Sequence, residues 1–270
     1  MLEDLYLKIT DSAKNHNFGY HHYTNMRSYI NMSKTEHFFL SRLDKMNDKL
    51  EQFKIDSARK NRTYILSLSY GRNENIAMWA LYCIPKEEAV RITFTKNSFN
   101  NYLGDAGDIA FKVENFQVKK DVQYRIESLT SIDVLYKSEK DNALKHGGEY
   151  ITADGNDLNG RFLGAVKNMA WSYENEVRII IILASDTDEY PEKIAIPITN
   201  ELIKDMKLKF GPWTTIKAKE NLISELKKLR DYWNIGNPSV SFINGTVAYK
   251  SLCDYCKGPY IPKTSEIVKL

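Results

Sequence analysis

The chain has 270 residues, of which 43% are hydrophobic and 27% charged. These proportions are typical of a globular protein and exclude a globally disordered chain. The formal charge of +3 permits contact with nucleic acid without indicating it. Since the sequence contains no run of 18 apolar residues and opens without a signal-peptide pattern, we expect a cytoplasmic protein with no membrane contact.

In the first hundred residues, alternating hydrophobicity and turn-forming residues predict short helices and strands. Thr24 or Asn25 is suited to cap a helix that starts at residue 26, and Pro85 is suited to end another. The predicted helices cover residues 3–16, 26–33 and 74–84, and the predicted strands cover residues 21–24, 37–41, 62–70 and 90–94.

The second part of the chain continues with short elements. Strands are predicted at 118–122, 132–136, 171–183 and 194–198, helices at 162–169, 199–207 and 214–231, and short strands within 239–262. Strands and helices mix without a βαβ rhythm, so we predict an α+β fold. No linker separates the segments. We therefore expect a single domain over 1–270, with a motif-bearing core over about 20–215 and a C-terminal helix and short strands over 214–262.

The most conspicuous pattern is the segment from Trp171 to Arg178. As a strand, it would place Glu174, Glu176 and Arg178 on one face. A solvated charge ladder on an edge strand is one interpretation. The run Ile179-Ile180-Ile181-Ile182-Leu183, however, is apolar on both faces, as in a central strand, and charges entering a buried strand are unfavourable unless they line a cleft.

Other candidate residues have structural as well as functional interpretations. His22 is a possible ligand-binding or catalytic residue, or a structural histidine, and Ser67 and Ser69 are hydroxyls on one strand face or ordinary strand residues. Tyr82 lies on an amphipathic helix and could stack on a flat ligand. The single Cys253-Asp254-Tyr255-Cys256 motif lacks two further zinc ligands, so no metal site is expected.

Four stretches together carry a resemblance. They are His22-Tyr23-Thr24 with Ser41 to Glu51, Ser67 to Phe94 with Met78-Trp79-Ala80-Leu81-Tyr82, Trp171 to Ile179, and Phe210-Gly211-Pro212. In this order they resemble a family of uncharacterised bacterial proteins known only as a domain of unknown function. The chain departs from that family at Lys49, where proline is usual, and at Glu87-Glu88, where a glycine is usual. The family is itself similar in layout to ADP-ribosyltransferases.

That resemblance implies a split, mixed or antiparallel sheet with flanking helices, and NAD as co-substrate without a metal. By resemblance, His22 with Tyr23 would hold the adenosine-side ribose, and Arg178 would restrain the glutamates or meet the pyrophosphate. Glu176 would be the catalytic glutamate and Glu174 the variable acidic residue before it. The nicotinamide pocket would be supported by Ser67 and Ser69, with Tyr70 or Tyr82.

The leading hypothesis is therefore an NAD-dependent ADP-ribosyltransferase of the toxin or phage-defence kind. Its acceptor would be a macromolecule, with nucleic acid slightly preferred over protein, and an antitoxin is a further candidate partner. One alternative is a non-enzymatic binding or regulatory module. Another is a metal-independent RNase-like toxin that uses His22 and Glu176.

Overall fold

A computed structural model describes residues 2–16, 18–48, 51, 57–105, 125–138, 143–146, 149–152, 162–185, 189–229, 238–241 and 243. The chain divides into two compact units. The first unit comprises Met1–Tyr20, Glu36–Gly71 and Thr95–Leu202, and the second comprises His21–Thr35, Arg72–Phe94 and Ile203–Leu270. The single-domain organisation stays a prediction.

The fold is α+β, with a mixed, largely antiparallel sheet and flanking helices. In the first unit, strand β3 (Thr63–Tyr70) pairs with β10 (Glu176–Leu183), which pairs in turn with β5 (Ile126–Asp133). Strand β2 (His37–Arg42) pairs with β3 and with β11 (Lys193–Pro197). All of these pairings are antiparallel.

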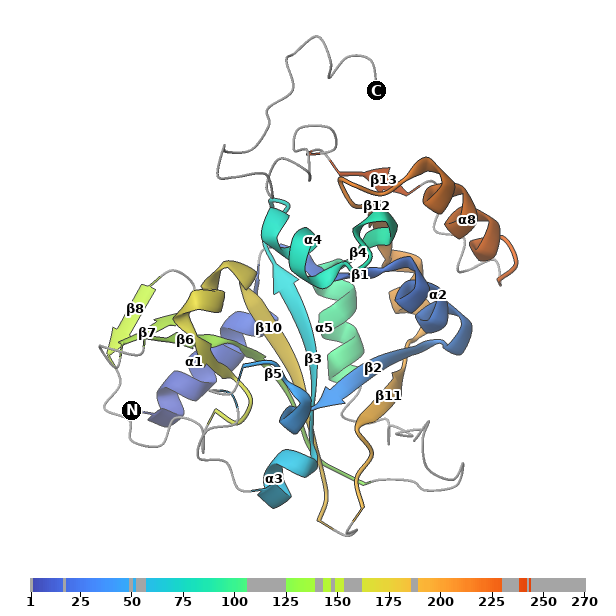
Figure 1. Ribbon diagram of the computed structural model, residues 1–270. Helices are drawn as coiled ribbons and strands as arrows, with labels where there is room; N and C mark the ends of the chain where they lie inside the picture. The colour runs from blue at the N-terminus through green and yellow to red at the C-terminus, as the bar shows by residue number, and fades with distance from the viewer. Residues whose placement is uncertain are drawn as a thin grey trace. The chain divides into compact units, whose positions relative to one another are not determined.

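Strand β10 is a central strand, as its isoleucine run predicts. It lies between β3 and β5, and Figure 1 shows it beside β3. Ile179 and Ile181 are almost fully buried on one face, and Ile180 is buried on the other. This arrangement removes the edge-strand interpretation of the charges at Glu176 and Arg178, because both edges of β10 are paired.

A second, four-stranded sheet completes the first unit in the order β8-β7-β6-β9. Its strands are β6 (Leu135–Lys137), β7 (Ala143–His146), β8 (Glu149–Thr152) and β9 (Val166–Asn168). Helix α1 (Leu2–Lys14) packs along β5. The remaining short helices are η1 (Leu43–Lys45), α3 (Ser57–Asn61), α5 (Lys96–Asp105), η4 (Met169–Glu174) and α7 (Asn200–Asp205), the last of which runs into the second unit.

The second unit has strands in the order β1-β4-β12-β13. These are β1 (Tyr20–Asn25), β4 (Ala89–Phe94), β12 (Lys207–Phe210) and β13 (Ser239–Val240). Its helices are α2 (Met26–Thr35), α4 (Ile76–Tyr82), η3 (Lys86–Glu88) and α8 (Ile216–Leu226). As predicted, Asn25 caps α2, because its Oδ1 accepts the Ser28 N–H at 2.8 Å.

Several predicted elements differ from the structure. The helix predicted at 162–169 is wrong: a turn with Gly164 in the left-handed region (φ +70°) leads into β9, and a right-handed helix cannot contain that conformation. The strand predicted at 171–183 begins only at Glu176, since residues 169–174 form the 3₁₀ helix η4. The strand predicted at 132–136 is split between β5 and β6, and β12 was not predicted.

Two predictions concern residues that are only partly described. The strand predicted at 118–122 lies outside the described residues, as do Cys253 and Cys256. Within 239–262, the described part contains β13, and the rest of that range, apart from residues 241 and 243, is not described. In the described ranges of the chain, no helix has the length and hydropathy that crossing a membrane requires.

Candidate active site

Five charged side chains form a buried cluster in the first unit, which we call the charge cluster. It consists of Glu51, Lys167 on β9, Glu174 at the end of η4, and Glu176 and Arg178 on β10. Lys167 is the most exposed of the five side chains, at 8%, and Arg178 is fully buried. Charges are rarely so deeply buried without partners.

Arg178 binds two of the three carboxylates. Its Nε donates to Glu176 Oε1 at 2.7 Å, and one Nη donates to Glu176 Oε2 at 3.1 Å. The guanidinium also donates to both carboxylate oxygens of Glu51, at 2.9 and 3.1 Å, and to the backbone carbonyl of Gly164. These planar, charge-assisted contacts fix the guanidinium and both glutamates in one geometry.

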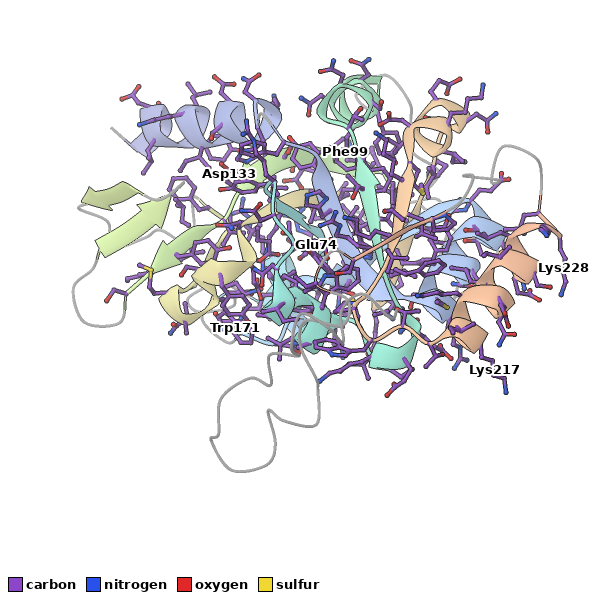
Figure 2. The ribbon with its side chains drawn as sticks, turned by 90° about the horizontal axis from the view of Figure 1, so that it is seen from above. Glu74, Phe99, Asp133, Trp171, Lys217 and Lys228 are labelled. Carbon is purple, nitrogen blue, oxygen red and sulfur yellow. The ribbon has the colours of Figure 1, made fainter. Side chains whose placement is uncertain are left out.

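Lys167 connects all three glutamates. Its Nζ donates to Glu174 Oε2 at 2.6 Å and to Glu176 Oε2 at 3.2 Å, and lies 3.7 Å from Glu51 Oε1. The same ammonium lies 5.1 Å from the centre of the Trp171 ring, a cation–π distance. Figure 2 labels Trp171 on η4.

The bend between η4 and β10 brings Glu174 and Glu176 to the same lysine. Asn168 caps η4 by accepting the Ala170 N–H at 2.9 Å, and Asn175 ends it in the left-handed conformation (φ 44°, ψ 60°). Glu174 and Glu176 were predicted to share a strand face. They do meet, but across a helix end and a strand start, because Asn175 adopts that conformation with comparatively little strain.

The cluster holds Glu176 ionised. Burial alone would raise the pKa of Glu176, but the charges of Arg178 and Lys167, with hydrogen bonds from Arg178 and Ser67, outweigh it and lower that pKa to about 2. The pKa of Arg178 lies well above its usual range, because Glu176 and Glu51 outweigh its desolvation. Three carboxylates face two cations, so the fully ionised cluster carries a formal charge of −1.

The predicted serine residues lie next to the cluster on β3. In the antiparallel register, Ser67 is opposite Arg178 and Ser69 is opposite Glu176. The backbone N–H of Tyr70 donates to the carbonyl of Asn175 at 3.0 Å. These β3 residues therefore lie beside the charged segment, and their role in a nicotinamide pocket stays a prediction.

The other predicted site residues belong to the second unit. His22 on β1 is half-buried, whereas its neighbours His21 and Tyr23 are buried. Tyr82, the last residue of α4, is half-buried. The convergence of His22, Tyr23 and Tyr82 with Glu176 in one cleft stays a prediction.

The structure adds cluster residues that were not predicted. Glu51 ends the stretch Ser41 to Glu51 that carried part of the resemblance, but no role was assigned to it. Lys167 lies nine residues before Glu176 and belongs to none of the stretches that carried the resemblance. The Glu51 segment is held against β9 because Asp48 Oδ2 accepts the Asn168 N–H at 2.8 Å. In the described part of the chain, no three His, Cys, Asp or Glu side chains are grouped so as to hold a metal ion.

The first unit also contains a histidine–aspartate pair that was not predicted from the sequence. His16 Nε2 lies 2.6 Å from Asp133 Oδ1, and the His16 ring stacks on Tyr70 with centroids 3.6 Å apart. Asp133 is buried opposite Val177 of β10 and is labelled in Figure 2. The sequence alone gives no signal for this pair, because 117 residues separate its members.

Of the stretches that carried the resemblance, Met78 to Tyr82 and Trp171 to Ile179 lie within one matched segment. Residues 78–179 match the family described as "Protein of unknown function (DUF2971)". The match extends from Met78 to Ile179, and it includes Lys167 but not Glu51. It supports a domain of unknown function over this segment. No curated protein and no solved structure matches the chain.

Proposed function

We propose that the protein is an NAD-dependent ADP-ribosyltransferase in which Glu176 acts on the ribose next to nicotinamide. The observation that carries this proposal is the excess negative charge of the charge cluster, where three carboxylates face two cations. A buried site with one uncompensated negative charge favours a positively charged ligand group. The nicotinamide ring of NAD⁺ is such a group.

The reaction develops positive charge where the cluster would stabilise it. The bond between nicotinamide and C1′ of the ribose breaks, nicotinamide leaves with the bonding electron pair, and the ribose becomes an oxocarbenium-like cation. With a pKa of about 2, Glu176 is ionised at neutral pH and suits the role of hydrogen-bond acceptor and charge stabiliser. An acceptor nucleophile then attacks C1′ and loses its proton to Glu174.

The acceptor in this proposal is a macromolecule, with nucleic acid slightly preferred because the chain carries a formal charge of +3. From the resemblance to ADP-ribosyltransferases, the proposal also takes a toxin or phage-defence role, with an antitoxin as a candidate partner.

The test is release of nicotinamide and transfer of label from labelled NAD. We expect the wild type to do both in the presence of mixed nucleic acid or protein acceptors, and Glu176→Gln to lower the rate by about 10²–10³-fold. Glu220→Gln, at an exposed position on α8, is the matched control and should be unchanged. If the wild type neither releases nicotinamide nor transfers label with any acceptor, the proposal is wrong.

A second variant separates lost chemistry from lost stability, because Glu176→Gln also alters a buried ion pair. Ser67→Ala removes a single hydrogen bond to Glu176 and keeps every charge. We expect this variant to keep its melting temperature within a few degrees and to lose activity by a smaller factor.

One observation favours a second candidate, a non-enzymatic binding or regulatory module. Glu174 and Glu176 are 2% and 4% exposed, and both are bound by cations of the same cluster. Such engagement is also found where ion pairs serve only to define a buried structure. The module predicts no NAD-dependent stabilisation of the fold, which separates it from the transferase.

A further inference from the structure

In the second unit, polar side chains gather on one face of the sheet formed by β1, β4 and β12. On β1 and β4, His21 Nδ1 lies 3.0 Å from Thr93 Oγ1, and Arg91 Nη1 donates to Tyr23 Oη at 3.4 Å. In the antiparallel register of β12 and β4, Lys209 is directly opposite Arg91, so both side chains lie on the same face.

Arg91 is a buried cation without a counter-charge among the described residues. Arg91 is only 6% exposed, and its Nε has no hydrogen-bond partner. Besides the bond to Tyr23 Oη, the guanidinium lies 5.8 Å from the centre of the Tyr23 ring. No carboxylate of the described residues forms an ion pair with it.

The acid nearest in this network is already engaged. Glu74 accepts hydrogen bonds from Lys209 Nζ at 2.8 Å, from Trp79 Nε1 at 3.2 Å and from the Ser241 hydroxyl. Glu74 is labelled in Figure 2, and the Glu74 side chain is only 2% exposed. Glu74 therefore neutralises Lys209 and leaves the charge of Arg91 uncompensated.

The two contacts with Tyr23 do not balance the burial of a guanidinium. A cation–π contact and one long hydrogen bond to a neutral hydroxyl are weak compared with the desolvation of a buried ion. A ligand oxyanion would supply the missing charge. The planar guanidinium presents Nε and Nη donors in a fork that matches two oxygens of a phosphate.

We propose that Arg91, with the Tyr23 hydroxyl and Lys209 beside it, forms a binding site for the phosphate group of a small phosphorylated molecule. The site lies wholly on strands β1, β4 and β12 of the second unit and uses no residue of the charge cluster. The inference stands independently of the transferase proposal, because phosphate binding is measured in the absence of NAD.

The experiment titrates the full chain with inorganic pyrophosphate by calorimetry and by thermal melting at constant ionic strength. We expect wild type to bind and to melt at a higher temperature. Arg91→Met should bind at least tenfold more weakly, and Arg91→Lys should also weaken binding because the fork is lost. Lys217→Gln, at an exposed position on α8 labelled in Figure 2, is the control and should bind as wild type does.

The melting temperature without ligand distinguishes a ligand-binding Arg91 from a structural one. If Arg91 is an uncompensated cation awaiting an anion, Arg91→Met should leave the ligand-free melting temperature unchanged or raise it. A purely structural Arg91 would instead give a lower melting temperature and no binding of pyrophosphate by wild type. Either that pair of results, or undiminished binding by Arg91→Met, overturns the inference.

The source of the phosphate is resolved by separate titrations with inorganic phosphate, pyrophosphate and ADP. If ADP binds more tightly than pyrophosphate and depends on Arg91, the natural ligand is a nucleotide. If pyrophosphate binds as tightly as ADP, the natural ligand is a free phosphate or pyrophosphate. Pyrophosphate binding without release of nicotinamide from NAD would retain this site and remove the transferase. Release of nicotinamide without pyrophosphate binding would do the reverse.

Discussion

Arg178 is the residue on which the charge cluster most depends, because it binds two carboxylates and is itself fully buried. Removing one partner of a buried ion pair leaves an uncompensated charge and typically destabilises a protein by about 3–5 kcal/mol. We expect Arg178→Met to lower the free energy of unfolding by about that amount in urea denaturation. Arg27→Met, at an exposed position on α2, should change it by less than about 0.5 kcal/mol. Equal effects of the two substitutions would contradict this account.

Glu176 makes the stability of the fold depend on acidity. Its pKa falls from 4.5 to about 2 in the folded state, so the stabilisation is complete above about pH 4.5 and is lost as the pH falls through 2. Its size is on the order of 3 kcal/mol. We expect the free energy of unfolding, measured at a series of pH values between 5 and 2, to fall more steeply for wild type than for Glu176→Gln. Parallel curves would show that Glu176 is not held ionised.

At this scale the sequence predicted part of the site. The alternation predicted that Glu174, Glu176 and Arg178 share one strand face. The structure confirms this for Glu176 and Arg178, which form an ion pair on β10, whereas Glu174 reaches Lys167 of the same cluster from the end of η4. Glu51 and Lys167 could not be predicted, since a single charged residue carries no local pattern and its partner is set by tertiary packing.

Among the elements, the junction of η4 and β10 decides the geometry of the glutamates. Asn175 occupies the left-handed region, which costs a β-branched residue about 1–2 kcal/mol and costs glycine little. We therefore expect Asn175→Val to lower the melting temperature and Asn175→Gly to leave it nearly unchanged. If valine were tolerated as well as glycine, the left-handed conformation at Asn175 would be in doubt.

The elements were predicted best where their residues follow one clear period. The strand at 63–70 and the helix at 2–14 are examples, and each differs from its predicted bounds by one or two residues. Prediction failed at 162–169, where an apolar composition resembles a helix but Gly164 turns the chain. It also failed at β12, whose four residues are too few for a period to show.

For the whole molecule, ligand binding offers the most direct measurement. A ligand at one hundred times its dissociation constant stabilises the folded state by about 2.7 kcal/mol. At about 2–4 °C per kcal/mol for a chain of this size, saturating NAD should raise the melting temperature by roughly 5–10 °C. The non-enzymatic module predicts no shift. Nicotinamide alone serves as the control for weak binding of the ring.

The α+β class was predicted from the mixture of elements, and the structure confirms it. The division into two units was not predicted. Each unit collects three separate segments of the chain, and β3 pairs with a strand more than a hundred residues away. Pairings over such separations leave no local trace in a single sequence.

The isoleucine run of β10 has a consequence beyond its place in the fold. Ile179 to Leu183 are five consecutive β-branched or aliphatic residues without a charge, a composition prone to intermolecular β-pairing whenever it is exposed. In the native fold β3 and β5 pair with both edges of this run. Glu176 and Arg178 come before it in the sequence, and their charges oppose its stacking with the same segment of other molecules. Variants that loosen the charge cluster, such as Arg178→Met, should therefore give a smaller soluble fraction than wild type on expression.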